Sequence, residues 1–354
     1  MPSVNVITLY RGSNCGAHLQ AHALNDVLLR LTGMQPAFIE IGFGSVGGLH
    51  PDKFVRKQIR RSLKRLQPAA IPFAVKGDAA YRKASAQLKA VPLADSYAPD
   101  DAIVFGSDEI WNVARSVIRR LPALWGEGVA GGKKIAYAPS ANGASLVDSE
   151  ASASLKENLS SFAAISARDE WTAQQVASLT GRNAPVVCDP TLLLTAEEWQ
   201  SHIQPQTKQL GSYALVYSYE GFMSPTTIAE TQNEAHARGL QLVSGGQLLK
   251  WCDKSIPCGP FELLQLFKNA DFVVTSTFHG TVLSTIFRKQ FASYAYQNSK
   301  VSCYLTSVGL ESRDASKRPL RNVLAETVPW SIFEQRLNPM RDESLAYLKE
   351  AVLG

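Results

Sequence analysis

The chain has 354 residues, of which 45% are hydrophobic, 19% charged and 9% aromatic, and its formal net charge is +5. This composition is typical of globular proteins and excludes an intrinsically disordered chain. The length predicts two domains, and a positive charge this small gives no reason to expect nucleic acid as a partner.

The first half of the sequence alternates predicted strands with predicted helices. An apolar run at 4–10 precedes a glycine-containing loop at 11–16, and a helical pattern follows over 17–31. Strands that alternate with helices indicate a parallel sheet covered on both faces. Further strands of the buried type are predicted at 37–41, 102–105, 134–138, 163–166 and 185–188.

Positive charge is concentrated in one predicted helix at 53–66. Its lysines and arginines, from Lys53 to Arg65, interleave with apolar residues at helical spacing. We favour a surface helix that docks by its apolar stripe; contact with anionic lipid head groups or a phosphate-bearing substrate is the alternative. No stretch has the length and apolarity of a membrane span, and the N-terminus lacks a signal-peptide pattern. We therefore expect a cytoplasmic protein, with peripheral contact to the inner membrane face if this helix binds lipid.

The pattern restarts after a polar stretch near residue 205, where we place the domain boundary. Strands are then predicted at 213–217, 240–244, 272–275 and 291–294, and helices at 225–238, 261–268 and 280–287. Pro339 is expected to break a C-terminal helical segment that could pack back on the first domain. The predicted fold class is α/β, with two Rossmann-like domains at 1–205 and 206–330, C-terminal helices at 331–354, and a ligand cleft between the domains.

The segment 270–281 contains the most informative local pattern. A buried-type strand ends in hydroxyl residues, among them Ser276 and Thr277, and His279 and Gly280 then open a helix. Backbone amides at a helix start can hold an anion, and catalytic residues of α/β enzymes gather at the carboxyl ends of strands. His279 is therefore the leading catalytic candidate. The alternative is that it serves only as a hydrogen-bonding group at the helix start.

A second pattern follows the strand predicted at 102–105. Gly106 allows the backbone to approach a ligand closely, and Ser107, Asp108 and Glu109 come directly after it. Asp108 or Glu109 could act as an acid or a base. That Ser107 or Asp108 simply caps the next helix is an equally open alternative.

Other loops carry weaker candidates. The loop at 11–16 suggests close approach to a ligand but fits neither the Walker nor the dinucleotide fingerprint. Arg168 follows a strand and could bind phosphate or carboxylate, or pair with Asp169 or Asp189. His18 and His22 are four residues apart on a helix, a spacing that can bind metal. With no third ligand marked, we favour surface or cleft-edge positions for both and expect no metal site.

Several segments, taken together and in this order, resemble the polysaccharide pyruvyl transferase family over residues 4–313. They are GSNCGAHLQA at 12–21, FGSDEIWN at 105–112, YAPS at 137–140, SARDEWT at 166–172, VCDPTLLL at 187–194, STFHGT at 276–281 and LESR at 310–313. The resemblance implies a fold like the two-domain glycosyltransferases of the B type. It also implies phosphoenolpyruvate as donor, a sugar of a polysaccharide, glycolipid or lipid-linked glycan as acceptor, and a pyruvate ketal as product.

The resemblance also implies roles for individual residues. His279 and Arg168 match residues expected to handle the donor. The other donor-binding candidates surround His279 in sequence and are Ser276, Thr277, Gly280 and Thr281. The acceptor-binding candidates lie in the first domain and are Asn14, Gly16, Ser107, Glu109 and Ser140. Many relatives carry arginine where this chain has Thr277, and Lys300 and Arg313 could supply the missing positive charge.

The chemistry implied by the resemblance needs proton transfer and charge stabilisation. Protonation of the methylene carbon of phosphoenolpyruvate makes the neighbouring carbon electrophilic, and a histidine suits this proton delivery near neutral pH. Asp108 is the candidate that receives a hydroxyl proton, with Glu109 as the alternative. The reaction requires neither a metal nor a cofactor besides the donor.

Two other functions remain open from the sequence. One is a nucleotide-sugar-dependent glycosyltransferase of the same architecture, for which the turn at Gly245 and Gly246 could serve the nucleotide. The other is a non-catalytic glycan-binding relative, for which Thr277 in place of arginine is the argument. The sequence gives no indication of an oligomeric state.

Overall fold

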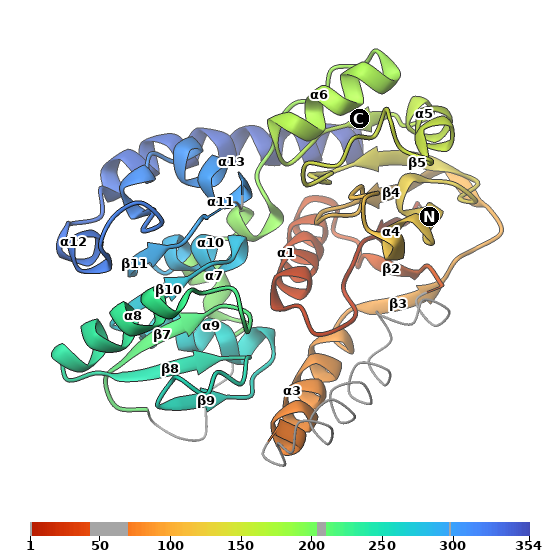
Figure 1. The fold of residues 1–354 in the computed structure, drawn as a ribbon. Coiled ribbons are helices and arrows are strands. Elements are labelled where there is room, and N and C mark those ends of the chain that lie inside the picture. Colours follow the sequence, from red (N-terminus) through yellow and green to blue (C-terminus); the bar gives the residue numbers. More distant parts are fainter. Residues whose placement is uncertain (1, 43–69, 204–209, 297–298) are drawn as a thin grey trace. The chain divides into compact units, whose positions relative to one another are not determined.

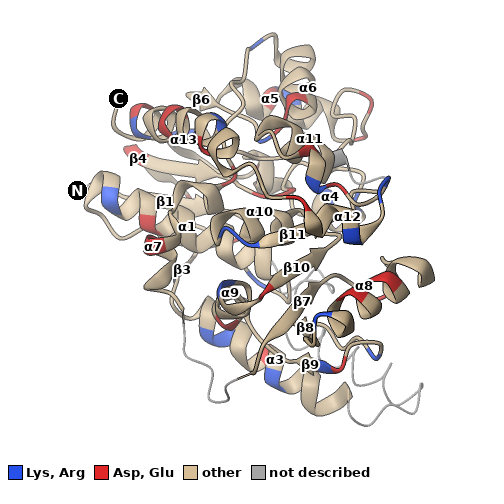
Figure 2. Cartoon of the chain, turned by 90° about the vertical axis from the view of Figure 1, so that its left-hand side faces the viewer, with Lys and Arg blue, Asp and Glu red and all other residues tan. Residues whose placement is uncertain are grey.

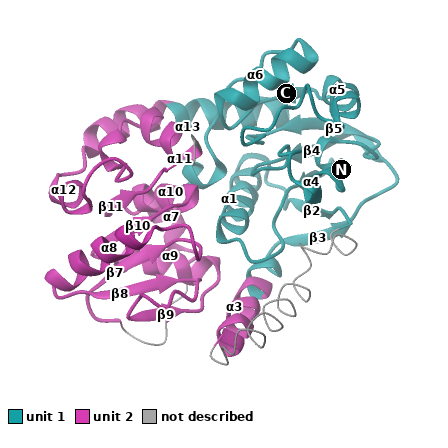
Figure 3. Ribbon diagram, in the orientation of Figure 1, with its two compact units in different colours: residues 1–54, 83–194, 340–354 teal, residues 55–82, 195–339 magenta. Residues whose placement is uncertain are grey.

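The computed structural model describes residues 2–42, 70–203, 210–296 and 299–354 (Figure 1). The predicted basic helix at 53–66 lies outside these residues. The chain forms two compact units: residues 1–54, 83–194 and 340–354 make up the first, and residues 55–82 and 195–339 the second (Figure 3). The chain passes from the first unit to the second between residues 194 and 195. The sequence analysis placed the domain boundary between residues 205 and 206.

The first unit is built on a six-stranded parallel sheet in the order β3-β2-β1-β4-β5-β6. Its strands are β1 Val4–Ile7, β2 Ala37–Glu40, β3 Lys89–Pro92, β4 Tyr97–Phe105, β5 Gly131–Ala136 and β6 Ala164–Ile165. Strand β1 is buried at every position, as expected at the centre of a covered parallel sheet. This is the strand order of Rossmann domains, and it puts the topological switch point between β1 and β4.

Helix α1 (Cys15–Thr32) connects β1 to β2. It begins where the Asn14 side chain accepts hydrogen bonds from the amides of Gly16 and Ala17, and it ends at Gly33, which has a left-handed backbone. The other helical segments assigned wholly to this unit are α4 Ser116–Arg119, η1 Pro122–Trp125, α5 Ser152–Ser160, α6 Glu170–Thr180 and η2 Pro190–Leu193.

The second unit has a five-stranded parallel sheet in the order β11-β10-β7-β8-β9. Its strands are β7 Tyr213–Tyr217, β8 Gln241–Gly245, β9 Lys254–Ile256, β10 Phe272–Thr275 and β11 Gln290–Ser293. The same Rossmann order recurs, with the switch point between β7 and β10. The predicted fold class, α/β with two Rossmann-like domains, is therefore confirmed, while the cleft between them stays a prediction.

The helices of the second unit connect and flank these strands. They are α7 Ala196–Gln200, α8 Pro225–Ala237, α9 Pro260–Asn269, α10 Phe278–Ile286, α11 Ser299–Ser307, η3 Glu311–Arg313 and α12 Leu320–Ala325. Helix α3 (Ala70–Ser85) belongs to this unit up to Arg82. Helix α10 follows β10 directly and carries the histidine that the sequence analysis singled out.

A single helix, α13, spans Trp330–Leu353 and contains Pro339. The predicted break at Pro339 is therefore wrong. Proline in a helix interior costs about 3 kcal/mol, and burial of apolar side chains on both sides, such as Phe333 and Leu348, offsets that cost. Helix α13 is 24 residues long but carries charges of both signs (Figure 2). Within the described residues, no helix combines the length and apolarity needed to cross a membrane.

The residues of α13 beyond Pro339 belong to the first unit. The Ser344 hydroxyl accepts a hydrogen bond from the Cys188 amide at 2.9 Å. The Tyr347 hydroxyl donates to the carbonyl oxygen of Ala136, at the end of β5, at 3.0 Å. These bonds join the chain terminus to the same edge of the sheet that carries the candidate site.

Candidate functional site

The residues predicted from the sequence fall into two groups, one at the switch point of each sheet. In open parallel sheets, ligands bind outside the carboxyl ends of the strands at this point. Each unit ties its two switch-point loops together through hydroxyl groups. In the first, Thr8 Oγ1 donates to the carbonyl oxygen of Ser107 at 3.1 Å. In the second, the hydroxyls of Ser218 and Ser276 lie 2.6 Å apart, and both side chains are buried.

The loop after β4 begins at Gly106, whose φ is +126°. A Cβ atom here would lie 2.0 Å from the carbonyl oxygen of Tyr137, so only glycine fits. Ser107 is fully buried; its amide donates to Gln20 Oε1 at 3.1 Å and its hydroxyl to the carbonyl oxygen of Ala138 at 2.7 Å. The geometry therefore gives Ser107 a structural role in this loop, in place of the expected contact with an acceptor.

Arg168 lies between two carboxylates. Its Nη1 atom is 3.0 Å from Asp189 Oδ2 and 3.8 Å from Asp108 Oδ1, and the Arg168, Asp189 and Asp108 side chains are 5%, 1% and 10% exposed. Burial lowers the pKa of the Arg168 guanidinium, but the nearby carboxylates of Asp189, Asp108, Glu109 and Asp169 together raise it above its usual value. Of the alternatives for Arg168, pairing with Asp189 is confirmed. The donor-binding role of Arg168 stays a prediction.

Asp169 caps the start of helix α6. Its Oδ1 atom accepts from the amide and the hydroxyl of Thr172 at 2.8 and 2.7 Å, at the start of α6. The helix that follows Asp108 is α4, whose start has no side-chain cap, so the capping role considered for Ser107 or Asp108 is wrong. The buried Ser140 hydroxyl donates to Asp169 Oδ2 at 2.6 Å and supports the same loop.

Glu109 is the more exposed carboxylate after β4, with 17% of its side chain accessible. Its Oε2 atom accepts from the side-chain amides of Asn112 at 2.8 Å and Asn142 at 3.1 Å, and it lies 3.8 Å from Arg115 Nη1. Glu109 thus connects the loop after β4 to the loop after β5. The sequence analysis did not single out Asn142, because no motif marks a partner that lies 33 residues away.

Hydroxyl side chains hold the segment between β10 and α10. Thr275 Oγ1 donates to the carbonyl oxygen of Tyr217 at 2.6 Å and accepts from the Thr277 amide at 3.1 Å. Thr277 then caps α10, since its Oγ1 atom accepts from the Gly280 amide at 3.0 Å. These bonds fix the helix start and place His279 in the first turn.

His279 is half-buried, and its ring packs edge-on against Phe278 with centroids 5.1 Å apart. Phe278 packs in turn against Tyr304, at 5.7 Å between centroids. The positive end of the helix dipole favours an anion beside this imidazole. Thr277 makes the N-cap hydrogen bond at the start of α10. The alternative role considered for His279 was that of a hydrogen-bonding group at this helix start, and the cap bond is not made by His279.

Gly280 tests how tightly this turn is built. A Cβ atom at Gly280 would lie 2.1 Å from Thr275 Oγ1 and 2.7 Å from Thr277 Oγ1. Gly280→Ala should therefore lower the free energy of unfolding of the second unit by about 2–3 kcal/mol, measured by urea unfolding. The matched control is Gly77→Ala in α3, where no atom lies within 4 Å of an added Cβ. At Gly77, the higher helix propensity of alanine should raise the free energy of unfolding by up to about 1 kcal/mol. Equal losses of stability in the two variants would contradict the crowding predicted at Gly280.

A family model described as polysaccharide pyruvyl transferase matches residues 14–298. The chain belongs to the polysaccharide pyruvyl transferase family. The match includes the segments that follow β4 and β10, and it confirms the resemblance found in the sequence. Membership implies a transferase that acts on polysaccharides. No curated protein matches the chain by sequence.

Solved structures with related folds cover most of the chain. UDP-GlcNAc 2-epimerase from Neisseria meningitidis is 8% identical, with a TM-score of 0.48 and full coverage of both chains. The E. coli heptosyltransferase WaaC is 16% identical, with a TM-score of 0.39, and the match covers 84% of this chain and 89% of that one. A Klebsiella pneumoniae protein, KP1_0663, is 13% identical, with a TM-score of 0.44 and coverage of 85% and 88%. At these identities and TM-scores, no property of these proteins is carried over to this chain.

Thr277, where the resemblance implies arginine in many relatives, caps α10 in this chain. The Arg313 side chain, proposed as another source of positive charge, is fully buried. Its Nη1 atom donates to the carbonyl oxygens of Val323 at 2.8 Å and Glu326 at 3.1 Å, and burial lowers its pKa against the opposing effect of Glu326. Arg313 therefore ties η3 to α12. Lys300 lies in the first turn of α11, and its donor-binding role stays a prediction.

The other predicted contacts stay predictions. Thr281 Oγ1 lies 2.8 Å from the Ser293 hydroxyl at the end of β11, and it also donates to the carbonyl oxygen of Thr277 at 3.0 Å. Asn14 is exposed, and Gly16 is buried in the first turn of α1. Asn14 and Glu109 are thus the acceptor-side candidates with accessible side-chain surface.

His18 and His22 are both buried, so the surface or cleft-edge positions expected for them are wrong. His18 Nε2 lies 3.0 Å from the carbonyl oxygen of Gly12, and His22 Nε2 lies 3.1 Å from that of Ala84. Each ring therefore fixes a loop or helix end to α1. In the part of the chain that the structure describes, no group of three or more His, Cys, Asp or Glu side chains could hold a metal ion.

His18 should make stability depend on pH. Burial lowers its pKa to about 4, against the opposing effect of the bond to Gly12, whereas an unfolded histidine has a pKa of about 6.5. The unfolded chain then binds a proton that the folded chain does not. Stability should therefore fall as the pH drops from about 6.5 to 4, by at most about 3 kcal/mol from this group. Urea unfolding of His18→Gln at pH 7.5 and 4.5 should show a smaller loss than wild type, and an equal loss would exclude this role.

Proposed function

We propose that this protein transfers the pyruvyl group of phosphoenolpyruvate to a sugar of a polysaccharide, glycolipid or lipid-linked glycan and forms a pyruvate ketal. Family membership supports a polysaccharide substrate. The observation that carries the donor assignment is the position of His279, in the first turn of α10 at the carboxyl end of β10. An imidazole beside a helix N-terminus can deliver a proton next to a bound phosphate or carboxylate.

The proposed reaction joins two sugar hydroxyls to one carbon and releases phosphate. A proton from the His279 imidazolium adds to the methylene carbon of phosphoenolpyruvate, and the adjacent carbon becomes electrophilic. The first hydroxyl oxygen bonds to that carbon and gives up its proton to a carboxylate. The second hydroxyl oxygen then displaces phosphate from the same carbon, and its proton leaves with the phosphate. Atoms and charge balance without a metal or a cofactor.

Asp108 is the proposed acceptor of the first hydroxyl proton. It lies at the carboxyl end of β4, is held by Arg168, and keeps 10% of its side chain accessible. Glu109, with 17% accessible, is the alternative. In this proposal, phosphoenolpyruvate binds at the second unit and the sugar at the first.

Thermal unfolding with phosphoenolpyruvate tests the donor directly and needs no acceptor. A donor at 100 times its dissociation constant should stabilise the folded protein by about 2.7 kcal/mol. UDP-glucose, GDP-mannose, pyruvate and inorganic phosphate are the comparison ligands. Stabilisation by a nucleotide sugar alone would overturn the proposal in favour of a glycosyltransferase. Stabilisation by no donor at all would leave a non-catalytic relative.

A further inference from the structure

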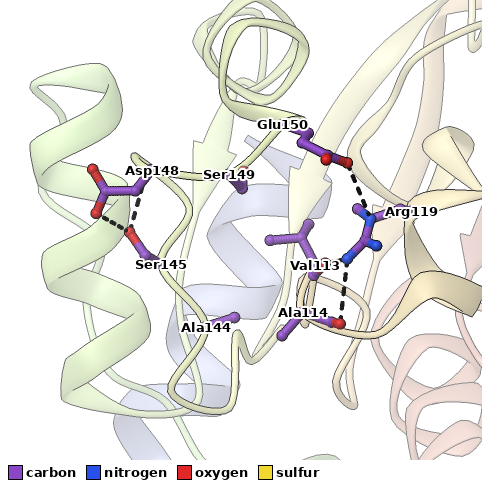
Figure 4. Close-up of a pocket in the computed structure, with 8 residues that line it drawn as sticks. All are labelled: Val113, Ala114, Arg119, Ala144, Ser145, Asp148, Ser149 and Glu150. Carbon is purple, nitrogen blue, oxygen red and sulfur yellow. Dashed lines mark hydrogen bonds and ion pairs between the residues drawn. The ribbon is translucent and has the colours of Figure 1, made fainter.

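The first unit contains a pocket of about 290 Å³ that no motif in the sequence marks (Figure 4). One wall is the segment from Val113 to Arg119, and the other is the loop from Ala144 to Glu150. Figure 4 shows Ser145 and Asp148 across from Arg119 and Glu150. Drug-sized ligands occupy pockets of about 300–1,000 Å³, so this volume suits one small ring rather than a nucleotide.

The polar groups of the pocket do not favour a free anion. Arg119 is the only cation among its lining residues, and Nη1 of Arg119 already donates to the carbonyl oxygen of Val113 at 2.7 Å. Its Nε atom lies 3.6 Å from Glu150 Oε2. With Asp148 included, the lining carries a formal charge of −1, from one cation and two carboxylates. Carboxylates and serine hydroxyls in this arrangement suit the many hydroxyl groups of a neutral sugar.

The loop that forms one wall is held rigidly by α6. The indole nitrogen of Trp171 donates to the carbonyl oxygen of Ala144 at 3.0 Å, and the Leu146 amide donates to Gln175 Oε1 at 2.8 Å. Trp171 as a whole residue nevertheless remains 43% exposed. Trp171 does not line the pocket, so the sugar assignment rests on the carboxylates and hydroxyls of the lining, which suit the polar rim of a sugar ring.

The pocket adjoins the candidate acceptor site through both of its walls. Val113 follows Asn112 directly, and Ala144 comes two residues after Asn142. Both asparagines donate to the same Glu109 carboxylate oxygen. A glycan bound at Glu109 would therefore have a second position for a neighbouring sugar unit within the same unit of the protein.

We propose that this pocket binds one neutral sugar ring of the acceptor glycan, adjacent to the sugar that is modified. The inference rests on the proposed transfer to a glycan. It predicts that the acceptor is recognised as at least a disaccharide, with the carboxylates of Asp148 and Glu150 accepting from sugar hydroxyls. Loss of one such charge-assisted hydrogen bond should weaken binding about tenfold.

Saturation-transfer NMR on the full chain tests the pocket with lactose, cellobiose and N-acetylglucosamine as probes. Wild type should give saturation transfer to at least one of them. Ala114→Phe fills the pocket from an exposed position and should abolish that signal. Ala98→Phe, at an exposed site near the amino end of β4, is the matched control and should keep it. Glu150→Gln and Asp148→Asn, which keep the side-chain shape, should weaken binding about tenfold each.

The outcomes separate this pocket from the proposed reaction. A signal that survives Ala114→Phe, or no signal from any probe in wild type, would overturn the pocket even if phosphoenolpyruvate stabilises the protein. Displacement of a bound sugar by inorganic phosphate, or binding of phosphate alone, would overturn the assignment to a neutral ring. If the sugar signal depends on Ala114 but phosphoenolpyruvate does not bind, the pocket stands as a glycan site and the donor assignment fails.

Discussion

Arg168→Met should lower the free energy of unfolding of the first unit by about 3–5 kcal/mol. Methionine preserves much of the side-chain volume but removes the guanidinium beside the Asp189 and Asp108 carboxylates, whose side chains are only 1% and 10% exposed. Breaking a buried ion pair from one side is costly because the remaining charge loses its compensation. Urea unfolding followed by tryptophan fluorescence measures the loss.

A surface pair provides the control for this prediction. Arg11 pairs with Glu40, and both side chains are about one-third or more exposed, so Arg11→Met should cost at most about 1 kcal/mol. The double variant Arg168→Met/Asp189→Asn also removes the negative charge of Asp189. Its free energy of unfolding should be about 1 kcal/mol or more higher than that of Arg168→Met alone. If Arg168→Met costs no more than Arg11→Met, the carboxylates are solvated and Arg168 is open to exchange partners with a donor.

The centres of the two sheets could be predicted from the sequence, and one edge strand of each sheet could not. Tyr213–Tyr217 and Phe272–Thr275 are strands with the predicted bounds, because continuous apolar runs are typical of strands buried on both faces. The strands Lys89–Pro92 and Lys254–Ile256 lie at sheet edges and have no fully buried residue, so no apolar run marks them. Conversely, the apolar run at 185–188 forms only an isolated bridge between Val186 and Ala167.

The candidate site shows the same division between local and long-range information. Local patterns were sufficient to predict the strand-to-helix turn at His279 and the need for glycine at position 106. Both features are set by neighbouring residues. Long-range partners were not predictable in this way. The bond from His22 to the carbonyl oxygen of Ala84 spans 62 residues, and no local pattern distinguishes a buried histidine on an apolar helix from one at its surface.

His279→Asn should reduce phosphate release from phosphoenolpyruvate by about 10²–10⁴-fold, the usual contribution of a positioned general acid. Asparagine is close in size and keeps a polar side chain in the first turn of α10, but it cannot donate a proton to carbon. Stabilisation by phosphoenolpyruvate should persist in the variant, because the proposed binding groups at the helix start are main-chain amides. The assay measures phosphate released with a glycan extract of the source cells as acceptor.

His236→Asn is the matched control, since His236 lies in the same unit with 54% of its side chain exposed and pairs with Asp253. It should keep the wild-type rate. A rate lost in His279→Asn together with the stabilisation by phosphoenolpyruvate would make His279 a binding group and leave the proton donor elsewhere. A rate retained in His279→Asn would exclude His279 from proton transfer, and the N-terminal turn of α10 would then act only as an anion site. Proton delivery by His279 and anion binding by the main-chain amides share one short turn capped by Thr277. Proton delivery is therefore shown only if His279→Asn loses phosphate release and still binds phosphoenolpyruvate.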